Sequence, residues 1–138
     1  TLVLDLPPGT GDVQLTMIQK YRPSGAVIVS TPQDLALIDA RRAIDLFVKA
    51  GVPIIGLIEN MAGYVCPSCG EVSDPFGTGG AEAAAAELGL PFLGRIPLDI
   101  RVRVASDAGQ PPAAGNGPEG VAFMGVADKV GDWIKGQG

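Results

Sequence analysis

The sequence predicts an α/β protein with a mostly parallel sheet and helices on both of its faces. Short apolar runs rich in Val, Ile and Leu alternate along the chain with longer segments whose apolar residues recur at helical spacing. This alternation is typical of βαβ units, in which parallel strands are covered on both sides. A length of 138 residues, with 46% hydrophobic and 18% charged residues, fits a single folded unit.

Four apolar runs are expected to form the strands. They are residues 1–6, 25–30, 52–59 and 91–96. The first run begins the chain at Thr1 without a Met and has the composition of a buried strand. A trimmed terminus would explain such a start, but we expect instead that a preceding segment is missing.

Helical patterns fill most of the sequence between and after these runs. The expected helices are residues 12–21, 31–51, 80–88, 99–108 and 119–135. The second is the clearest, because Leu37, Ala40 and Ile44 recur at helical spacing while Asp39 and Arg42 fall on the opposite face.

Boundary residues and connections complete this outline. Thr31 suits the N-cap of the second helix, Pro32 its first helical position and Gly51 its end. Residues 60–80 are expected to be a long loop, and long loops are often functional. Residues 109–118, rich in Gly and Pro, are the nearest thing to a linker.

Composition excludes several classes of function. The net charge is −5 and no run of Lys and Arg is present, so we expect no nucleic-acid partner. The absence of His rules out a Ser-His-Asp triad and His-ligated zinc. No apolar run is long enough for a membrane span and no signal peptide begins the chain, so we expect a cytoplasmic protein without membrane contact.

Asp5 ends the first expected strand, in the stretch Asp-Leu-Pro-Pro-Gly-Thr-Gly-Asp at 5–12. Open α/β sheets bind ligands at the carboxyl ends of their strands, and Mg²⁺ prefers oxygen ligands, so Asp5 is a candidate metal-side residue. The amide of Gly9 can approach a phosphate closely. The alternative is a plain strand-to-helix turn with Asp12 as N-cap. Neither this stretch nor Gly-Thr-Gly-Gly at 77–80 completes a nucleotide-binding fingerprint.

Asn60 follows the third expected strand, at the same sheet edge as Asp5. Its side-chain amide offers a donor and an acceptor, which match the edge of a purine base. The alternative is turn formation, for which Asn is well suited.

Cys66 and Cys69 form a Cys-x-x-Cys motif in the expected loop 60–80. Two thiolates at this spacing can hold one metal, and soft sulfur selects zinc or an iron–sulfur cluster. Two cysteines are too few for a four-Cys site, but a symmetric dimer would supply four ligands. A structural turn and a thioredoxin-like redox pair remain as alternatives; the redox pair is disfavoured because the motif lies in mid-loop before Gly70.

Six motifs in this order resemble the Mrp/ApbC family of iron–sulfur cluster carrier ATPases. They are Asp-Leu-Pro-Pro-Gly-Thr-Gly-Asp at 5–12, Thr-Pro-Gln-Asp-Leu-Ala-Leu-Ile-Asp-Ala-Arg at 31–41, Glu-Asn-Met at 59–61, Cys-Pro-Ser-Cys-Gly at 66–70, Phe-Gly-Thr-Gly-Gly at 76–80 and Ile-Pro-Leu-Asp at 96–99. The resemblance extends to about Gln110. It implies a partial P-loop NTPase domain of the SIMIBI type, related to MinD and ParA, with residues 1–138 as its C-terminal portion.

The resemblance also implies roles at the nucleotide. Asp5 matches the family's Walker B aspartate, which acts with Mg²⁺, and residues 7–9, including Gly9, match the switch that senses the γ-phosphate. Asn60 resembles the residue that contacts the base of ATP. The backbone of Pro97 and Asp99 is expected near the adenine.

Cluster and partner roles follow from the same resemblance. Cys66 and Cys69 match the pair that holds a [4Fe–4S] cluster between the two subunits of a homodimer. Asp39 resembles a position on the helix that faces the dimer interface. Apo iron–sulfur proteins are the expected recipients of the cluster.

The sequence departs from the family at the phosphate site. The loop Gly-Lys-Gly-Gly-Val-Gly-Lys-Ser/Thr is absent from these residues, as is the strand before it. The first two expected strands would therefore flank an empty position in the sheet. Because lysines supply much of the electrostatics of phosphoryl transfer, we expect ATPase activity only of the complete protein and none of this chain alone.

The sequence thus predicts an iron–sulfur cluster carrier or scaffold that uses ATP when complete. A metal-binding dimerisation module that does not use nucleotide is the main alternative. A thiol oxidoreductase is a third.

Overall fold

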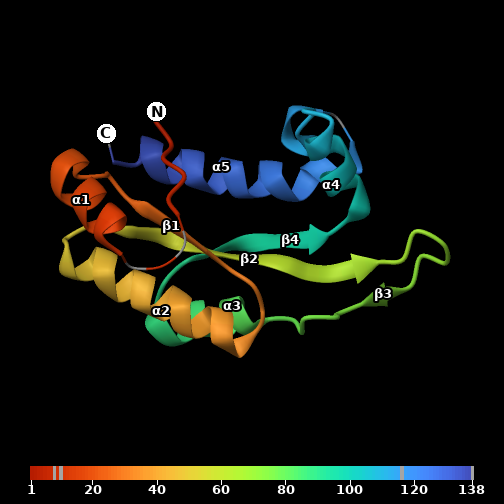
Figure 1. The fold of residues 1–138 in the computed structure, drawn as a ribbon, viewed down its shortest axis with the longest axis horizontal. Helices are drawn as coiled ribbons and strands as arrows, with labels where there is room; N and C mark the ends of the chain where they lie inside the picture. Colours follow the sequence, from red (N-terminus) through yellow and green to blue (C-terminus); the bar gives the residue numbers. More distant parts are fainter. Residues whose placement is uncertain (8, 10, 116, 138) are drawn as a thin grey trace.

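A four-stranded sheet lies between helices in the computed structural model, which describes residues 1–7, 9, 11–115 and 117–137 (Figure 1). Its strands are β1 (Ala26–Ser30), β2 (Ile54–Val65), β3 (Val72–Ser73) and β4 (Phe92–Leu98). The central strand β2 pairs in parallel with β1 and β4, and antiparallel with the short β3. The predicted α/β class is confirmed, with a mixed sheet in which parallel pairing dominates.

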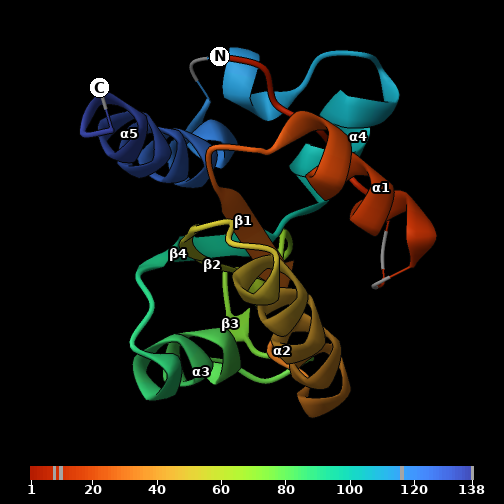
Figure 2. The same ribbon diagram turned by 90° about the vertical axis from the view of Figure 1, so that its left-hand side faces the viewer.

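Helices cover both faces of this sheet, as predicted. They are α1 (Asp12–Tyr21), α2 (Asp34–Lys49), α3 (Gly80–Leu88), α4 (Ile100–Asp107) and α5 (Val121–Lys135). Figures 1 and 2 show α2 and α3 on one face and α5 on the other. Of the helices described, none has the length and apolar character needed to cross a membrane.

Two apolar clusters hold these layers together. On one face, Leu57 of β2 is only 1% exposed and packs with Ile28, Ile44 and other residues of β1, α1, α2 and α3. On the other face, Ile55 and neighbouring residues of β2 and β4 pack against α5. The adjacent residues Leu57 and Ile58 lie in different clusters, because successive residues of a strand point to opposite faces, so the unbroken apolar run in β2 contributes to both clusters.

The first predicted strand is wrong. Residues 1–6 form no strand, and Leu2 and Val3 are 82% and 85% exposed. An isolated extended segment has no partner for its backbone groups, and among the described residues nothing pairs with the outer edge of β1. The composition of the segment suits a strand, but in the described part of the chain no strand lies beside it.

The predicted loop at 60–80 is only partly a loop. β2 continues six residues past Glu59 to Val65, and β3 returns beside it with Tyr64 opposite Ser73 and Val65 opposite Val72. Asn60 and Gly63 disfavoured a strand on propensity, but pairing with β4 and β3 on the two sides of β2 overrides that preference.

Helix boundaries differ from the prediction by a few residues. α2 begins at Asp34 with Gln33 at the N-cap, because the Thr31 hydroxyl donates to the Gln33 side chain instead of capping the helix. Asp99 is the N-cap of α4 rather than part of it, and its side chain accepts from the Arg101 N–H. Residues 109–118 include a 3₁₀ turn, Pro112–Ala114.

Candidate functional site

The two cysteines lie at the tip of the hairpin formed by β2 and β3, which Figure 1 shows extending beyond the helical layers. The Cys66 N–H donates to the Glu71 carbonyl at 2.9 Å, and the Gly70 N–H donates to the Cys66 carbonyl at 2.9 Å. Gly70 adopts a φ of +75°, which glycine tolerates and which closes the turn. The turn therefore places both thiols at one exposed end.

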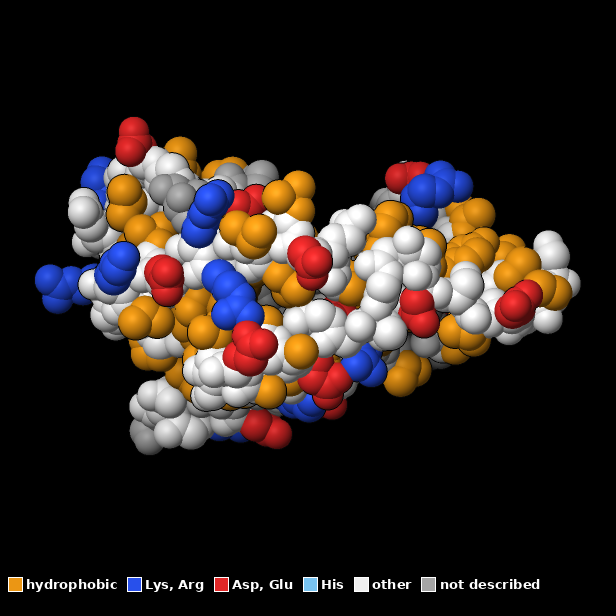
Figure 3. Space-filling model, turned by 90° about the horizontal axis from the view of Figure 1, so that it is seen from below, with side chains coloured by type: hydrophobic (Ala, Val, Ile, Leu, Met, Phe, Trp, Pro, Cys, Tyr) orange, Lys and Arg blue, Asp and Glu red, His pale blue; other side chains and the backbone are white. Residues whose placement is uncertain are grey.

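Both thiols are accessible and lie in an apolar setting. Neither cysteine is in a disulfide; Cys69 is exposed and Cys66 is partly exposed. Val65 and Val72, which flank the turn, are 51% and 66% exposed. In Figure 3 hydrophobic side chains gather at the right-hand end, where the hairpin lies. The tip thus presents two thiols beside exposed apolar side chains, a combination suited to a protein contact.

The hairpin stabilises the thiolate form of Cys66. Hydrogen bonds from the backbone N–H of Ser68 and then of Cys69 lower the pKa of the Cys66 thiol, because they favour its charged form. The thiolate is the form that binds metals and attacks electrophiles.

Alkylation of Cys66 is therefore expected to rise with pH at a lower midpoint than alkylation of a free cysteine peptide. The measurement is the rate of iodoacetamide labelling from pH 5 to 10 in the metal-free Cys69→Ala variant, which isolates Cys66. Because this variant keeps the Ser68 N–H, the larger cause of the shift remains. A midpoint at or above that of the peptide would contradict the described turn.

The cysteine pair alone is an incomplete metal site. Across the described part of the chain, no group of three or more Cys, Asp, Glu or His side chains is placed to hold a metal ion. Zinc and iron–sulfur clusters take four ligands, so two thiolates from one chain fit half of such a site. The two thiolates are chemically suitable donors and would need further ligands to complete a four-ligand site.

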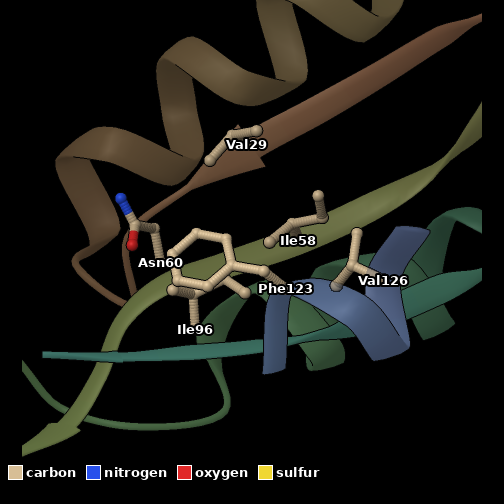
Figure 4. Close-up of a pocket in the computed structure, with 6 residues that line it drawn as sticks. All are labelled: Val29, Ile58, Asn60, Ile96, Phe123 and Val126. Atoms are coloured by element: carbon tan, nitrogen blue, oxygen red, sulfur yellow. The ribbon is translucent and has the colours of Figure 1, made fainter. Parts of the chain in front are cut away.

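Asn60 lies at the rim of an apolar pocket of about 190 Å³. The lining comes from three strands and α5: Val29, Ile58, Ile96, Phe123 and Val126 (Figure 4). The Asn60 side-chain oxygen accepts from the Met61 N–H at 2.9 Å, and Figure 4 shows the amide pointing away from the apolar side chains. The sequence does not single out Phe123 as a lining residue, because it is one of several apolar residues in the segment 119–135.

Asp99 is held by Arg101 rather than left open to a ligand. The Arg101 Nε donates to both carboxylate oxygens of Asp99 at 3.0 Å, and the side chain of Asp99 is 14% exposed. The hydrogen bond from Arg101 lowers the pKa of the Asp99 carboxyl. The Asp99 carboxylate is thus already engaged, which leaves the backbone at this position as the group open to a ligand.

The remaining predicted residues are not gathered into one site. Asp5 and Gly9 lie in the coil before α1, outside the sheet, and Gly9 has a φ of +97°. Pro8 of the predicted switch lies outside the described residues. Asp39 is exposed on α2 and pairs with Arg42 at 3.1 Å, so the predicted polar face of that helix is confirmed.

Glu59 is a residue that sequence reasoning did not single out. It lies on β2 immediately before Asn60, and its side chain is completely buried. Its carboxylate accepts from the N–H groups of Gly79 and Ala81 at the start of α3. A charged residue at the end of an apolar strand was the only available signal, because these partners are 20 and 22 residues away.

These features define a class: an α/β protein with a mostly parallel sheet, an apolar pocket that has Asn60 at its rim, and a two-cysteine hairpin that extends the central strand. Comparison with known proteins identifies the family. Residues 1–131 match the ParA family described as NUBPL iron-transfer P-loop NTPase. The chain belongs to the Mrp/NUBPL family of iron–sulfur cluster carrier P-loop NTPases.

Several curated relatives are similar over most of the chain. The iron–sulfur cluster carrier protein of Methanocaldococcus jannaschii is 45% identical over 137 residues, covering 99% of this chain and 47% of the relative. The iron–sulfur protein required for NADH dehydrogenase, mitochondrial, of Arabidopsis thaliana is 48% identical, covering 98% and 43%. The chain thus spans less than half the length of these relatives.

A solved structure supports the fold. A nucleotide-binding protein from Archaeoglobus fulgidus, determined in complex with ADP, superposes with a TM-score of 0.72 at 40% sequence identity. The match covers 86% of this chain and 48% of that one. The fold described here is therefore that of part of a P-loop nucleotide-binding protein.

Proposed function

We propose that this chain is the cluster-carrying portion of an iron–sulfur cluster carrier, and that a [4Fe–4S] cluster is its cargo. Cys66 and Cys69 of two copies would supply the four ligands in a homodimer. The observation that carries the proposal is the exposed thiol pair at a hairpin tip, with no third ligand among the described residues. The apolar side chains beside the thiols favour contact with a second copy.

Transfer of the cluster is the second part of the proposal. An exposed tip lets an acceptor protein reach the sulfur ligands, and apo iron–sulfur proteins are the proposed acceptors. We place this activity in the cytoplasm, although one relative is named as mitochondrial.

Anaerobic reconstitution with iron and sulfide, followed by incubation with an apo [4Fe–4S] acceptor, tests both parts. The chain should gain charge-transfer absorbance in the visible range and then lose it as the acceptor gains activity. Failure to form the absorbing species would refute the carrier function.

We propose that ATP is bound only by the complete protein. The base of ATP would contact Asn60 and the backbone of Pro97 and Asp99. Asp5 would act with Mg²⁺, and Gly9 would lie near the γ-phosphate. When bound, Mg²⁺ neutralises charge on the phosphates. Asn60 at the rim of an apolar pocket supports the base assignment, and the position of Asp5 outside the sheet agrees with an incomplete phosphate site.

The 138-residue chain alone is expected neither to bind ATP tightly nor to hydrolyse it. The lysine-bearing phosphate loop is absent from its sequence, and no other run of basic residues replaces it. Phosphate release assays and calorimetric titration with Mg-ATP check this expectation. Turnover above a protein-free blank would contradict it.

A metal-binding dimerisation module that uses no nucleotide is the second candidate, favoured by the absence of the phosphate loop from these residues. Titration of ATP into the chain joined to the N-terminal half of a relative separates the two. Tight binding that Asn60→Ala weakens supports the first candidate, whereas no binding supports the second.

A further inference from the structure

Glu59 lies where both arms of the cysteine hairpin meet the sheet. The outgoing arm is its own strand, β2, which continues through Asn60 to Val65. The return arm runs from β3 to the start of α3 at Gly80. The Glu59 side chain is 0% exposed, and a buried carboxylate is unfavourable unless its charge and its oxygens have partners.

Those partners come from the end of the return arm. One carboxylate oxygen of Glu59 accepts from the Gly79 N–H at 2.9 Å, and the other accepts from the Ala81 N–H at 2.8 Å. The Gly79 N–H belongs to the N-cap residue of α3 and the Ala81 N–H to its first turn. At this end of a helix backbone donors lack partners within the helix and negative charge is favoured. Each carboxylate oxygen of Glu59 therefore has its own backbone donor.

A cation completes the arrangement from the neighbouring strand. The Arg95 Nε of β4 lies 3.3 Å from Glu59, and Arg95 also pairs with Glu82 of α3. Glu59 thereby joins β2, β4 and α3 at one point. The Arg95 side chain is 46% exposed, so Glu59 is the buried centre of this group and Arg95 its rim.

Close packing holds the same turn from the other side. A Cβ atom on Gly80 would lie 2.5 Å from the Pro32 carbonyl oxygen, nearer than such atoms approach in folded proteins. Gly79 has a φ of +78°, which disfavours other residues. The return arm therefore packs closely against the segment after β1 and is held there by its hydrogen bonds to Glu59.

We propose that Glu59 is a positioning residue. It fixes the position of the hairpin tip, which carries Cys66 and Cys69, relative to Asn60. One arm of the hairpin is fixed by the strand that carries Glu59, and the other by its carboxylate. The importance of this positioning rests on the proposed function, in which the cysteines bind the cluster and Asn60 contacts the base of ATP. A displacement of β2 near Asn60 would then shift the cysteines, because both arms of the hairpin are held at Glu59.

Hydrogen exchange on the metal-free chain tests the positioning directly. Glu59→Gln removes one acceptor and the charge, so the amides of Gly79 and Ala81, and those of β3, should exchange at least about tenfold faster. Exchange in β1 and α2 should be unchanged. Glu82→Gln is the matched control, because Glu82 also pairs with Arg95 but is 52% exposed. Equal exchange in the two variants would overturn the proposal.

Two further measurements keep the outcome decisive. If Glu59→Gln fails to fold, hydrogen exchange is measured on the wild-type chain. The Gly79 amide should be protected from exchange because Glu59 is its acceptor, and an unprotected amide would overturn the proposal. In the reconstituted chain, Glu59→Gln should broaden the electron paramagnetic resonance signal of the reduced cluster, whereas Glu82→Gln should not. If the wild-type chain forms no cluster while the exchange result holds, the proposed function fails and the positioning role stands.

Discussion

Replacing Cys66 with Ala is expected to abolish cluster assembly rather than weaken it. The variant leaves one thiolate per chain, and two chains then offer two ligands where a [4Fe–4S] cluster needs four. The expected result after anaerobic reconstitution is loss of the visible charge-transfer absorbance and of bound sulfide. Cys69→Ala should behave in the same way.

Ser68→Ala is the control for these variants. It alters the same exposed turn but keeps both sulfurs and the backbone N–H that faces Cys66. It should assemble the cluster with wild-type stoichiometry. A Cys66→Ala variant that still binds iron and sulfide at the wild-type level would show that the ligands lie elsewhere.

Leu57→Ala is expected to destabilise the fold by about 2–5 kcal/mol, because truncation of a buried Leu loses apolar burial and leaves a cavity. Leu57 is 1% exposed on the central strand and packs in the cluster shared by β1, α2 and α3. Urea unfolding followed by circular dichroism measures the change in free energy of unfolding.

Val29→Ala is the matched control on the neighbouring strand. Val29 is 58% exposed at the edge of the sheet, so its truncation should cost less than about 1 kcal/mol. Equal losses in the two variants would contradict the assignment of β2 as the buried centre.

Patterns of burial predicted most of the fold. Residues that contact a core are apolar and recur with the period of their helix or strand. The apolar run at 52–59 and the helical spacing of Leu37, Ala40 and Ile44 show this pattern. Residues 1–6 have the same kind of pattern and still form no strand. A strand depends on a neighbour as well as on composition, and propensity does not reveal whether a neighbour is present.

The candidate site was predictable where its chemistry is local. Cys66 and Cys69 are three residues apart, so their spacing already indicates a shared ligand role. The hairpin that carries them was not predicted, because Asn60 and Gly63 disfavour a strand and part of the pairing that overrides this preference comes from β4, which is distant in sequence. Glu59 was missed for a related reason: its role is defined by amides that only the folded chain brings to it.

The stoichiometry of the reconstituted chain decides whether two copies share one cluster. Native mass spectrometry under anaerobic conditions gives the number of chains and the cluster mass in one measurement. We expect one [4Fe–4S] cluster per two chains, and single chains without a cluster for Cys66→Ala. A cluster held by a single chain, or a dimer that forms equally well without Cys66, would contradict it.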